Sequence, residues 1–236
     1  MATTAKEKFK TYHNVFDDFT NRDLFKLISE GYFDGLESPI KIGKEANIFS
    51  ALKDNEKIMV KIYRVNSCNF NKMFDYIRSD PRYIGLQGKK RSIILHWVQR
   101  EYRNLLKARE AGVRVPKPIA VKNYILVMEF IGRGDDLAPP LKDKKPKNPE
   151  KFFKDIIENM KKLYKGGLVH ADLSAFNILN WEEKPVFIDF SQCSSLQDLR
   201  SQEYLIRDIK NICTYFRKLG LKVSEEETLK KIREKA

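Results

Sequence analysis

The residues best suited to chemistry lie within the segment Leu168–Leu179. It contains His170 and Asp172, with Asn177 five residues after that Asp, and a second carboxylate, Asp189, follows a later apolar run. A phosphoryl-transfer site uses one carboxylate facing the acceptor, and an amide and a second carboxylate holding metal on the ATP phosphates. The spacing predicts Asp172 and Asp189 as catalytic residues. It also predicts Asn177 and Asp189 as ligands of Mg²⁺, or of Mn²⁺ in its place. For His170 a structural hydrogen bond is favoured over acid–base work.

Two charged residues occupy positions where apolar residues are expected. Lys61 lies in the apolar strand pattern Ile58–Ile62, and Glu101 lies in the apolar stripe of a helix predicted over residues 93–111. A buried charge is costly unless it is paired, so the two are predicted to form an ion pair. In a phosphoryl-transfer site such a pair holds the lysine against the ATP phosphates. A purely structural salt bridge is the alternative.

Two further segments are candidates for nucleotide contact. A strand predicted over residues 124–130 leads to a hinge, where Met128 would line the pocket and backbone groups near Glu129 and Ile131 would pair with an adenine edge. A plain core strand is equally compatible with that pattern. Upstream of Lys61, one loop suits the covering of phosphates, although its single glycine fails both the glycine-rich kinase and Walker patterns and an ordinary hairpin turn is the alternative. Its residues are Ile42, Gly43, Lys44, Glu45 and Ala46.

The helices and strands that must position these residues are predicted from the spacing of apolar residues and from the capping and glycine residues that interrupt it. Thr20 is expected to cap a first helix that Gly31 ends. Strands are expected over residues 40–51 and 57–63, with a hairpin turn at 53–56. Further helices are expected over residues 149–165, 199–219 and 225–233. A break at residues 132–136 is the expected lobe boundary.

Residues 64–91 form the least regular stretch, rich in basic and aromatic residues. Loops this long inside a compact domain are usually functional or disordered. We therefore expect a functional or disordered basic segment here. RNA contact through it, with Lys89, Lys90 and Arg91 contributing, is a hypothesis.

Composition narrows the class of protein. The chain has 236 residues, 42% of them hydrophobic, and a formal net charge of +13. Its three cysteines lack disulfide or zinc-ligand spacing, and neither a signal peptide nor a membrane-length apolar run is recognisable. An intracellular, cytoplasmic protein without membrane contact is expected. The positive charge favours a polyanionic partner such as nucleic acid, with a lysine-rich solvated surface as the alternative.

Taken together, the motifs resemble the RIO family of atypical serine/threonine protein kinases, and its type-1 subgroup most of all. The resemblance spans about residues 16–219, and only Phe190 looks more like type 2. The matching pieces are Gly43–Asn47, Val60–Arg64, Trp97 through Glu101 to Leu105, His170–Ser174 and Ile188–Gln192.

The resemblance implies an α+β, two-lobed, trimmed protein-kinase-like fold with a small β-rich N-lobe and a short helical C-lobe. The expected division is an N-terminal helical segment (1–38), an N-lobe (39–131) containing the flexible loop (64–91), and a C-lobe (132–236) lacking the activation loop and peptide-docking subdomain. It also implies ATP as cofactor and a role in maturation of the small ribosomal subunit, with the subunit precursor, its RNA and its proteins as partners.

Catalysis in this family is thought to use an aspartyl-phosphate at the metal-binding Asp, here Asp189, in a kinase or ATPase cycle with autophosphorylation. Ser174, a candidate nucleotide-site residue, stands where protein kinases carry a lysine that neutralises the transferring phosphoryl group. Fast transfer to a peptide is therefore not expected. Two alternatives stay open: a small-molecule phosphotransferase of the aminoglycoside or choline type, and a kinase-shaped scaffold without turnover.

Overall fold

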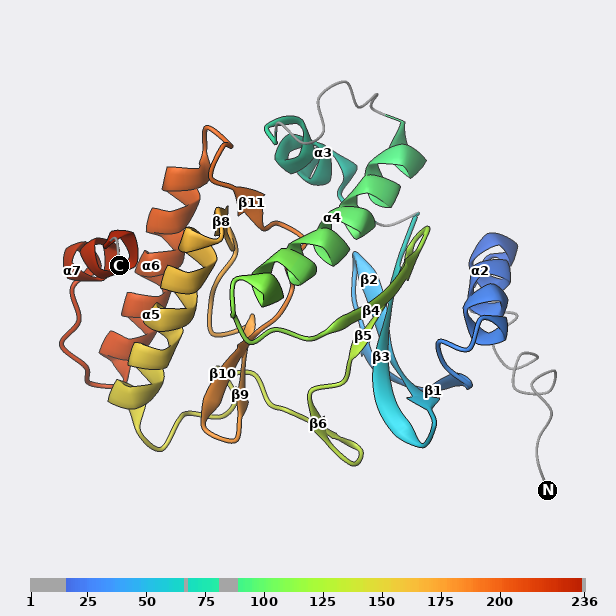
Figure 1. Cartoon of the computed structure of the whole chain (residues 1–236), viewed down its shortest axis with the longest axis horizontal. Helices are drawn as coiled ribbons and strands as arrows, with labels where there is room; N and C mark the ends of the chain where they lie inside the picture. The colour runs from blue at the N-terminus through green and yellow to red at the C-terminus, as the bar shows by residue number, and fades with distance from the viewer. Residues whose placement is uncertain (1–15, 66–67, 81–88, 235–236) are drawn as a thin grey trace.

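An antiparallel sheet and a group of helices lie on either side of one long helix (Figure 1). The computed structural model describes residues 16–65, 68–80 and 89–234. The sheet has the strand order β1-β2-β3-β5-β4. Its strands are β1 (Gly35–Ile42), β2 (Ala46–Lys53), β3 (Glu56–Tyr63), β4 (Pro118–Lys122) and β5 (Ile125–Glu129). The long central helix is α4 (Lys90–Glu110), and α2 (Asp18–Ser29) lies at the other side of the sheet. Because β1 begins at Gly35, the sheet includes residues on the N-terminal side of the predicted boundary at 39.

Side chains of β3 alternate between two faces of the sheet, so its apolar residues and Lys61 have different surroundings. Ile58, Val60 and Ile62 pack in the core that includes the buried leucines of α2. Because successive side chains of a strand point to opposite faces, Lys61 faces α4 instead. This alternation puts a lysine on the inner face of an otherwise apolar strand.

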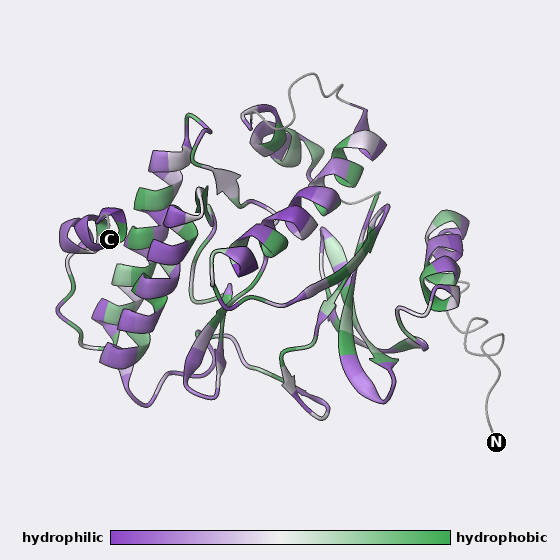
Figure 2. Cartoon of the chain, in the orientation of Figure 1, coloured by the Kyte–Doolittle hydropathy of each residue, from purple (hydrophilic) through white to green (hydrophobic). Residues whose placement is uncertain are grey.

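The predicted hairpin between β2 and β3 is present. Its turn residues Asp54 and Asn55 have φ of 51° and 64°, the left-handed values that a tight hairpin turn of this kind requires. Figure 2 shows a hydrophilic tip and more hydrophobic strands above it.

The single strand predicted over residues 40–51 is wrong, because β1 and β2 divide it. Gly43 N–H donates to Ala46 O at 3.1 Å and closes a tight turn between the two strands. A Cβ at Gly43 would lie 2.8 Å from the Ala46 carbonyl oxygen, so the turn needs a residue without a side chain.

The cap of α2 also differs from the prediction. Asp17 caps the helix by accepting a hydrogen bond from Thr20 N–H at 2.8 Å. Thr20 itself is buried inside the helix. Gly31 follows the helix with φ of 76°, as its predicted role in ending it requires.

The irregular stretch predicted over residues 64–91 contains a helix, α3 (Phe70–Arg78), and includes the start of α4. The Asn69 side chain caps α3 by accepting from Lys72 N–H. Met73, Tyr76 and Ile77 form its buried face. Nine residues with one such triplet are too few for periodicity to stand out. Residues 66–67 and 81–88 of this stretch lie outside the described residues.

The C-terminal half follows the prediction closely. Helix α5 (Pro149–Lys165) has the predicted bounds, as does α7 (Glu225–Arg233), and α6 (Ser201–Lys218) lies inside its predicted range. Short two-stranded ladders complete this half: β6 (Gly132–Arg133) with β7 (Asp136–Leu137), β8 (Leu168–Val169) with β11 (Ser194–Ser195), and β9 (Ile178–Trp181) with β10 (Lys184–Phe187). Within the described residues no helix combines the length and apolar character needed to cross a membrane.

Candidate active site

Lys61, Glu101 and Asp189 meet at the junction of the sheet, α4 and the segment after β10. Lys61 Nζ lies 2.9 Å from Glu101 Oε1 and 3.2 Å from Asp189 Oδ1. The Tyr63 hydroxyl donates to the other oxygen of Glu101. The predicted ion pair is therefore present, and it extends to Asp189.

The charges of this cluster fix one another. Burial acts to lower the pKa of Lys61, but Asp189 and Glu101 outweigh it and raise that pKa above its ordinary value. Burial acts to raise the pKa of Asp189, but Lys61 and the hydroxyl of Ser191, 2.8 Å from Oδ1, lower it to about 2. Asp189 is thus a carboxylate at neutral pH. Its φ of 62° is unusual for a residue other than glycine and places it among strained backbone positions found at functional sites.

Asp172 lies on the loop after β8, which α6 holds in place. Asp208 of α6 accepts hydrogen bonds from Ala171 N–H and Leu173 N–H, both at 2.8 Å. Arg207 donates to the Ala171 carbonyl, and Ala171 has φ of 65°. The backbone is therefore fixed on both sides of Asp172.

Two amides approach Asp172. Asn177 Nδ2 donates to Asp172 O at 2.9 Å and to its Oδ2 at 3.2 Å, and Gln192 Nε2 donates to the same Oδ2 at 3.2 Å. Burial and the nearby Asp189 charge raise the pKa of Asp172. A carboxylate with a raised pKa is suited to accepting a proton during a reaction.

His170 contacts the two residues that flank Asp189 in the chain. Its Nε2 lies 3.0 Å from the Ile188 carbonyl, and its ring packs edge-on against Phe190 at 4.8 Å between centroids. Burial lowers the pKa of His170 to about 4, so the ring is neutral at pH 7. The predicted structural hydrogen bond is present.

A cleft between the two halves gathers several of the predicted residues. Lys61, Glu101, Met128, Ile131, Asn177 and Asp189 all line it. The Glu129 side chain does not: it pairs with Arg114 at 2.6 and 2.8 Å, outside the cleft. Ser174 is also not among the lining residues, and its hydroxyl accepts from Phe176 N–H at 3.3 Å within the same loop.

The predicted phosphate loop lies beside the cleft rather than in its wall. Lys41 and Ile48, which flank the loop, line the cleft, whereas Ile42 to Ala46 do not. Ile42 is exposed and Ala46 is buried in the core. The Gly43 carbonyl accepts from the Arg64 side chain at 3.3 Å.

The donor set fits one hard cation bound together with phosphates. Asn177 uses its amide nitrogen on Asp172, which turns its carbonyl oxygen elsewhere. Among the described residues, Lys61 and Ser191 both bond the same oxygen of Asp189, Oδ1. Mg²⁺ at nucleotide sites typically takes one or two carboxylates and fills its other positions with water and phosphate. The described residues contain no group of three His, Cys, Asp or Glu side chains that could hold a metal alone.

Sequence reasoning missed the residues that hold this site. Asp208 lies among Leu205, Ile209 and Ile212 on the buried face of α6. A carboxylate in an apolar stripe is the signal that identified Glu101, and it was available here too. Arg100 and Asn104 gave no such signal. Both bond backbone carbonyls about ninety residues away, and Arg100 also contacts the side chains of Ser194 and Asp80.

Comparison with known proteins agrees with this geometry. The RIO domain profile matches residues 47–229. The RIO-type serine/threonine-protein kinase Rio1 of Haloferax volcanii is 40% identical over 93% of this chain and 76% of its own length. The corresponding Rio1 of Methanocaldococcus jannaschii is 43% identical over 90% of this chain and 73% of its own. Among solved structures, the Rio2 kinase of Chaetomium thermophilum has a TM-score of 0.70 at 22% identity, covering 90% of this chain and 67% of that one.

The fold is thus the predicted trimmed kinase fold, and the protein is a phosphotransferase of the protein-kinase class. Within that class, the chain belongs to the RIO family of serine/threonine-protein kinases, and the two archaeal relatives above are of the Rio1 type. These relatives favour neither the small-molecule phosphotransferase nor the scaffold without turnover.

Proposed function

We propose that this chain binds ATP with Mg²⁺ in the cleft and transfers the γ-phosphoryl group to Asp189. The observation that carries the proposal is the state of Asp189, an ionised carboxylate held 3.2 Å from Lys61 and facing the cleft. A second structure of the Chaetomium thermophilum Rio2 kinase, of the same fold at 23% identity, is described as an ADP/Mg²⁺-phosphoaspartate complex.

Each predicted site residue receives a role in this proposal. Lys61, fixed by Glu101, binds the phosphates, and Asn177 and Asp189 hold Mg²⁺, with Mn²⁺ as a substitute. When bound, the metal would neutralise charge on the phosphates. The loop residues Ile42 to Ala46 close over the phosphates, and Ser174 lies near the transferred group.

The adenine would lie against Met128. Glu129 N–H already donates to Lys117 O at 2.8 Å, and Ile131 O already accepts from Ala138 N–H at 2.8 Å. We therefore assign the adenine edge to the Glu129 carbonyl and the Ile131 N–H.

In the transfer step, a carboxylate oxygen of Asp189 attacks the γ-phosphorus, the bond to the β-phosphate oxygen breaks, and ADP leaves. Asp172, on the loop after β8, then orients the acceptor of the phosphoryl group.

The chain would act on the precursor of the small ribosomal subunit in the cytoplasm, and the net charge of +13 supports an RNA-containing partner. The boundary between the N-lobe and the C-lobe would lie near residue 131.

The test is single-turnover incubation with γ-labelled ATP and Mg²⁺, comparing wild type with Asp189→Asn and Asp172→Ala. Asn tolerates the left-handed backbone at position 189, so that variant should fold while lacking the nucleophile. We expect a hydroxylamine-labile label in wild type and none in Asp189→Asn. An acid-stable phosphoserine as the only product would contradict the proposal.

A further inference from the structure

Gln192 reaches the catalytic carboxylate from the segment that also carries Asp189. We propose that Gln192 is a further catalytic residue, which together with Asp172 orients the water that hydrolyses the aspartyl-phosphate at Asp189. The inference rests on the proposed function, and it assigns the second half of the cycle.

The side-chain contact sets the polarity of the Gln192 amide. Gln192 Nε2 lies 3.2 Å from Asp172 Oδ2, and an ionised carboxylate only accepts, so the NH₂ group faces Asp172. The carbonyl oxygen Oε1 then remains to accept a hydrogen bond from water. Asn177 donates to the same Oδ2. Within the described part of the chain, no hydrogen bond reaches Asp172 Oδ1 or Gln192 Oε1, so two acceptors remain to orient one water.

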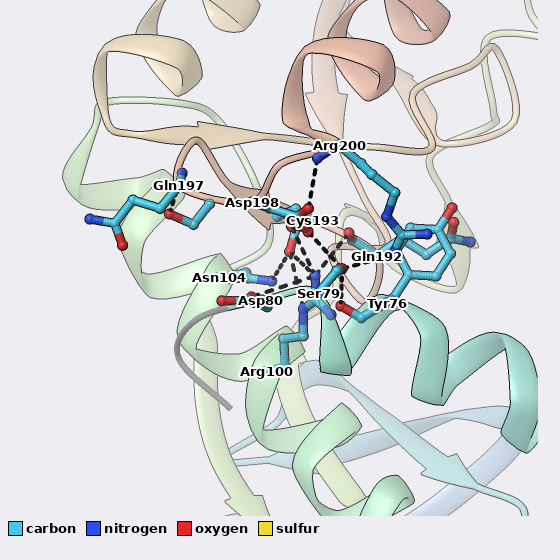
Figure 3. A network of polar contacts seen from close by, with 12 residues as sticks. Tyr76, Ser79, Asp80, Arg100, Asn104, Gln192, Cys193, Gln197, Asp198 and Arg200 are labelled. Atoms are coloured by element: carbon cyan, nitrogen blue, oxygen red, sulfur yellow. Dashed lines mark hydrogen bonds and ion pairs between the residues drawn. The ribbon is translucent and has the colours of Figure 1, made fainter. Parts of the chain in front are cut away.

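The backbone around Gln192 is held by a buried polar network (Figure 3). Arg100 Nη2 lies 3.4 Å from Gln192 O, and Arg100 Nε and Asn104 Nδ2 donate to Cys193 O at 3.2 and 2.8 Å. Arg100 and Asn104 are both fully buried. These buried donors hold the main chain at Gln192 and Cys193 in place, and the contact with Asp172 Oδ2 orients the Gln192 side-chain amide.

A second layer of the network anchors the following residues. Ser194 Oγ donates to Asp198 Oδ2 at 2.7 Å, and Ser79 Oγ, from the end of α3, donates to the same atom at 2.9 Å. Arg200 N–H donates to the other oxygen of Asp198 at 2.9 Å. The segment after Asp189 is therefore tied to α3, α4 and the start of α6.

The same short segment positions the phosphorylated residue. Ser191 Oγ donates to Asp189 Oδ1 at 2.8 Å, one residue before Gln192. The nucleophile of the first step and the water-orienting amide of the second thus share one rigid piece of backbone. A glutamine that orients attacking water is a known device in phosphoryl-transfer enzymes of other folds.

The proposed step balances without any further reactant. The oxygen of water attacks the phosphorus, the bond from phosphorus to the Asp189 oxygen breaks, and the proton of water passes to Asp172. Inorganic phosphate leaves, and Asp172 returns its proton to solvent.

The experiment separates formation of the phosphoenzyme from its decay. The wild-type chain and the variants Gln192→Ala and Gln192→Glu are labelled with γ-labelled ATP and Mg²⁺, then chased with excess unlabelled ATP, and the hydroxylamine-labile label is followed. Gln197→Ala is the matched control, because Gln197 is an exposed glutamine in the same segment. Its backbone N–H donates to Ser195 Oγ, a bond that the substitution keeps.

We expect both Gln192 variants to form the label at a rate within about twofold of wild type and to lose it at least tenfold more slowly. Gln197→Ala should match wild type in both rates. Unchanged decay in both Gln192 variants, or an equal fall in formation and decay, would overturn the role of Gln192. A wild type that forms no such label would instead overturn the aspartyl-phosphate proposal, and the role of Gln192 with it.

Discussion

At the scale of single residues, the site depends on charges buried together. Lys61 and Glu101 are 8% and 1% exposed. A buried pair of this kind is costly to break, because either partner alone would be an uncompensated charge. The same cost keeps Lys61 directed at Asp189 and the cleft, so the Lys61–Glu101 pair affects both stability and activity.

His170 gives a prediction about pH. Its folded-state pKa of about 4 lies below the ordinary value of 6.5, so the unfolded chain binds the proton first as pH falls. Its contribution to the free energy of unfolding is complete above pH 6.5 and is lost as pH falls toward 4. His170→Gln keeps a donor for the Ile188 carbonyl without this titration.

The measurement is urea unfolding of both proteins at several pH values. We expect the stability advantage of wild type over His170→Gln to shrink by about 3 kcal/mol between pH 7 and 4. Taking the difference at each pH removes the titration of Asp208, whose pKa burial raises to about 7, because Asp208 is present in both. A difference independent of pH would contradict the prediction.

At the scale of elements, α6 determines where the catalytic loop lies. Asp208→Ala leaves the buried N–H groups of Ala171 and Leu173 without their acceptor. We expect a loss of about 2–5 kcal/mol in unfolding free energy at pH 8, together with slower phosphoenzyme formation. Lys210→Ala, at an exposed position of the same helix, should change stability by less than about 0.5 kcal/mol. If both variants unfolded at the same urea concentration, the role of Asp208 would be wrong.

Elements with strong periodicity could be predicted from the sequence, and those fixed by distant contacts could not. Helix α5 carries several turns of apolar residues and a capping Asn148, and its bounds were predicted as observed. Helix α3 is short, and its partners Arg207 and Trp97 are far away in the chain, so its segment read as irregular. The strand predicted over residues 40–51 and the loop predicted at Ile42–Ala46 were in conflict, and the structure decides for the turn, because Gly43 N–H bonds Ala46 O there.

The site also has parts that local sequence patterns predict and parts that depend on distant contacts. The Lys61–Glu101 pair and the Asp172–Asn177 loop were predictable because a charge in an apolar pattern, or a fixed spacing, is visible in one segment. Gln192 lay in a recognised motif, yet its contact with Asp172 depends on how two loops meet in three dimensions. No pattern in one segment contains that information.

At the scale of the whole molecule, the net charge of +13 bears on the proposed RNA partner. Lys89 and Arg91, at the start of α4, are exposed. Neutralising both as Lys89→Gln/Arg91→Gln should reduce the slope of log affinity against log salt by about 1.5, since each lost phosphate contact removes 0.7–0.9. Binding to a fragment of small-subunit precursor RNA is the measurement.

The matched control is Lys154→Gln/Lys165→Gln, which removes the same charge from exposed positions of α5. Its slope should equal that of wild type. Equal slopes for both double variants would mean that the start of α4 does not contact the RNA.

The two-sided attachment of α4 limits how this kinase can be switched. Glu101 holds Lys61 on one side, while its neighbours Arg100 and Asn104 hold the carbonyls of the segment after Asp189 on the other. Moving α4 out from between the sheet and that segment would break both attachments at once and expose three buried polar side chains. Outward movement of this helix is therefore a poor off-state for the chain.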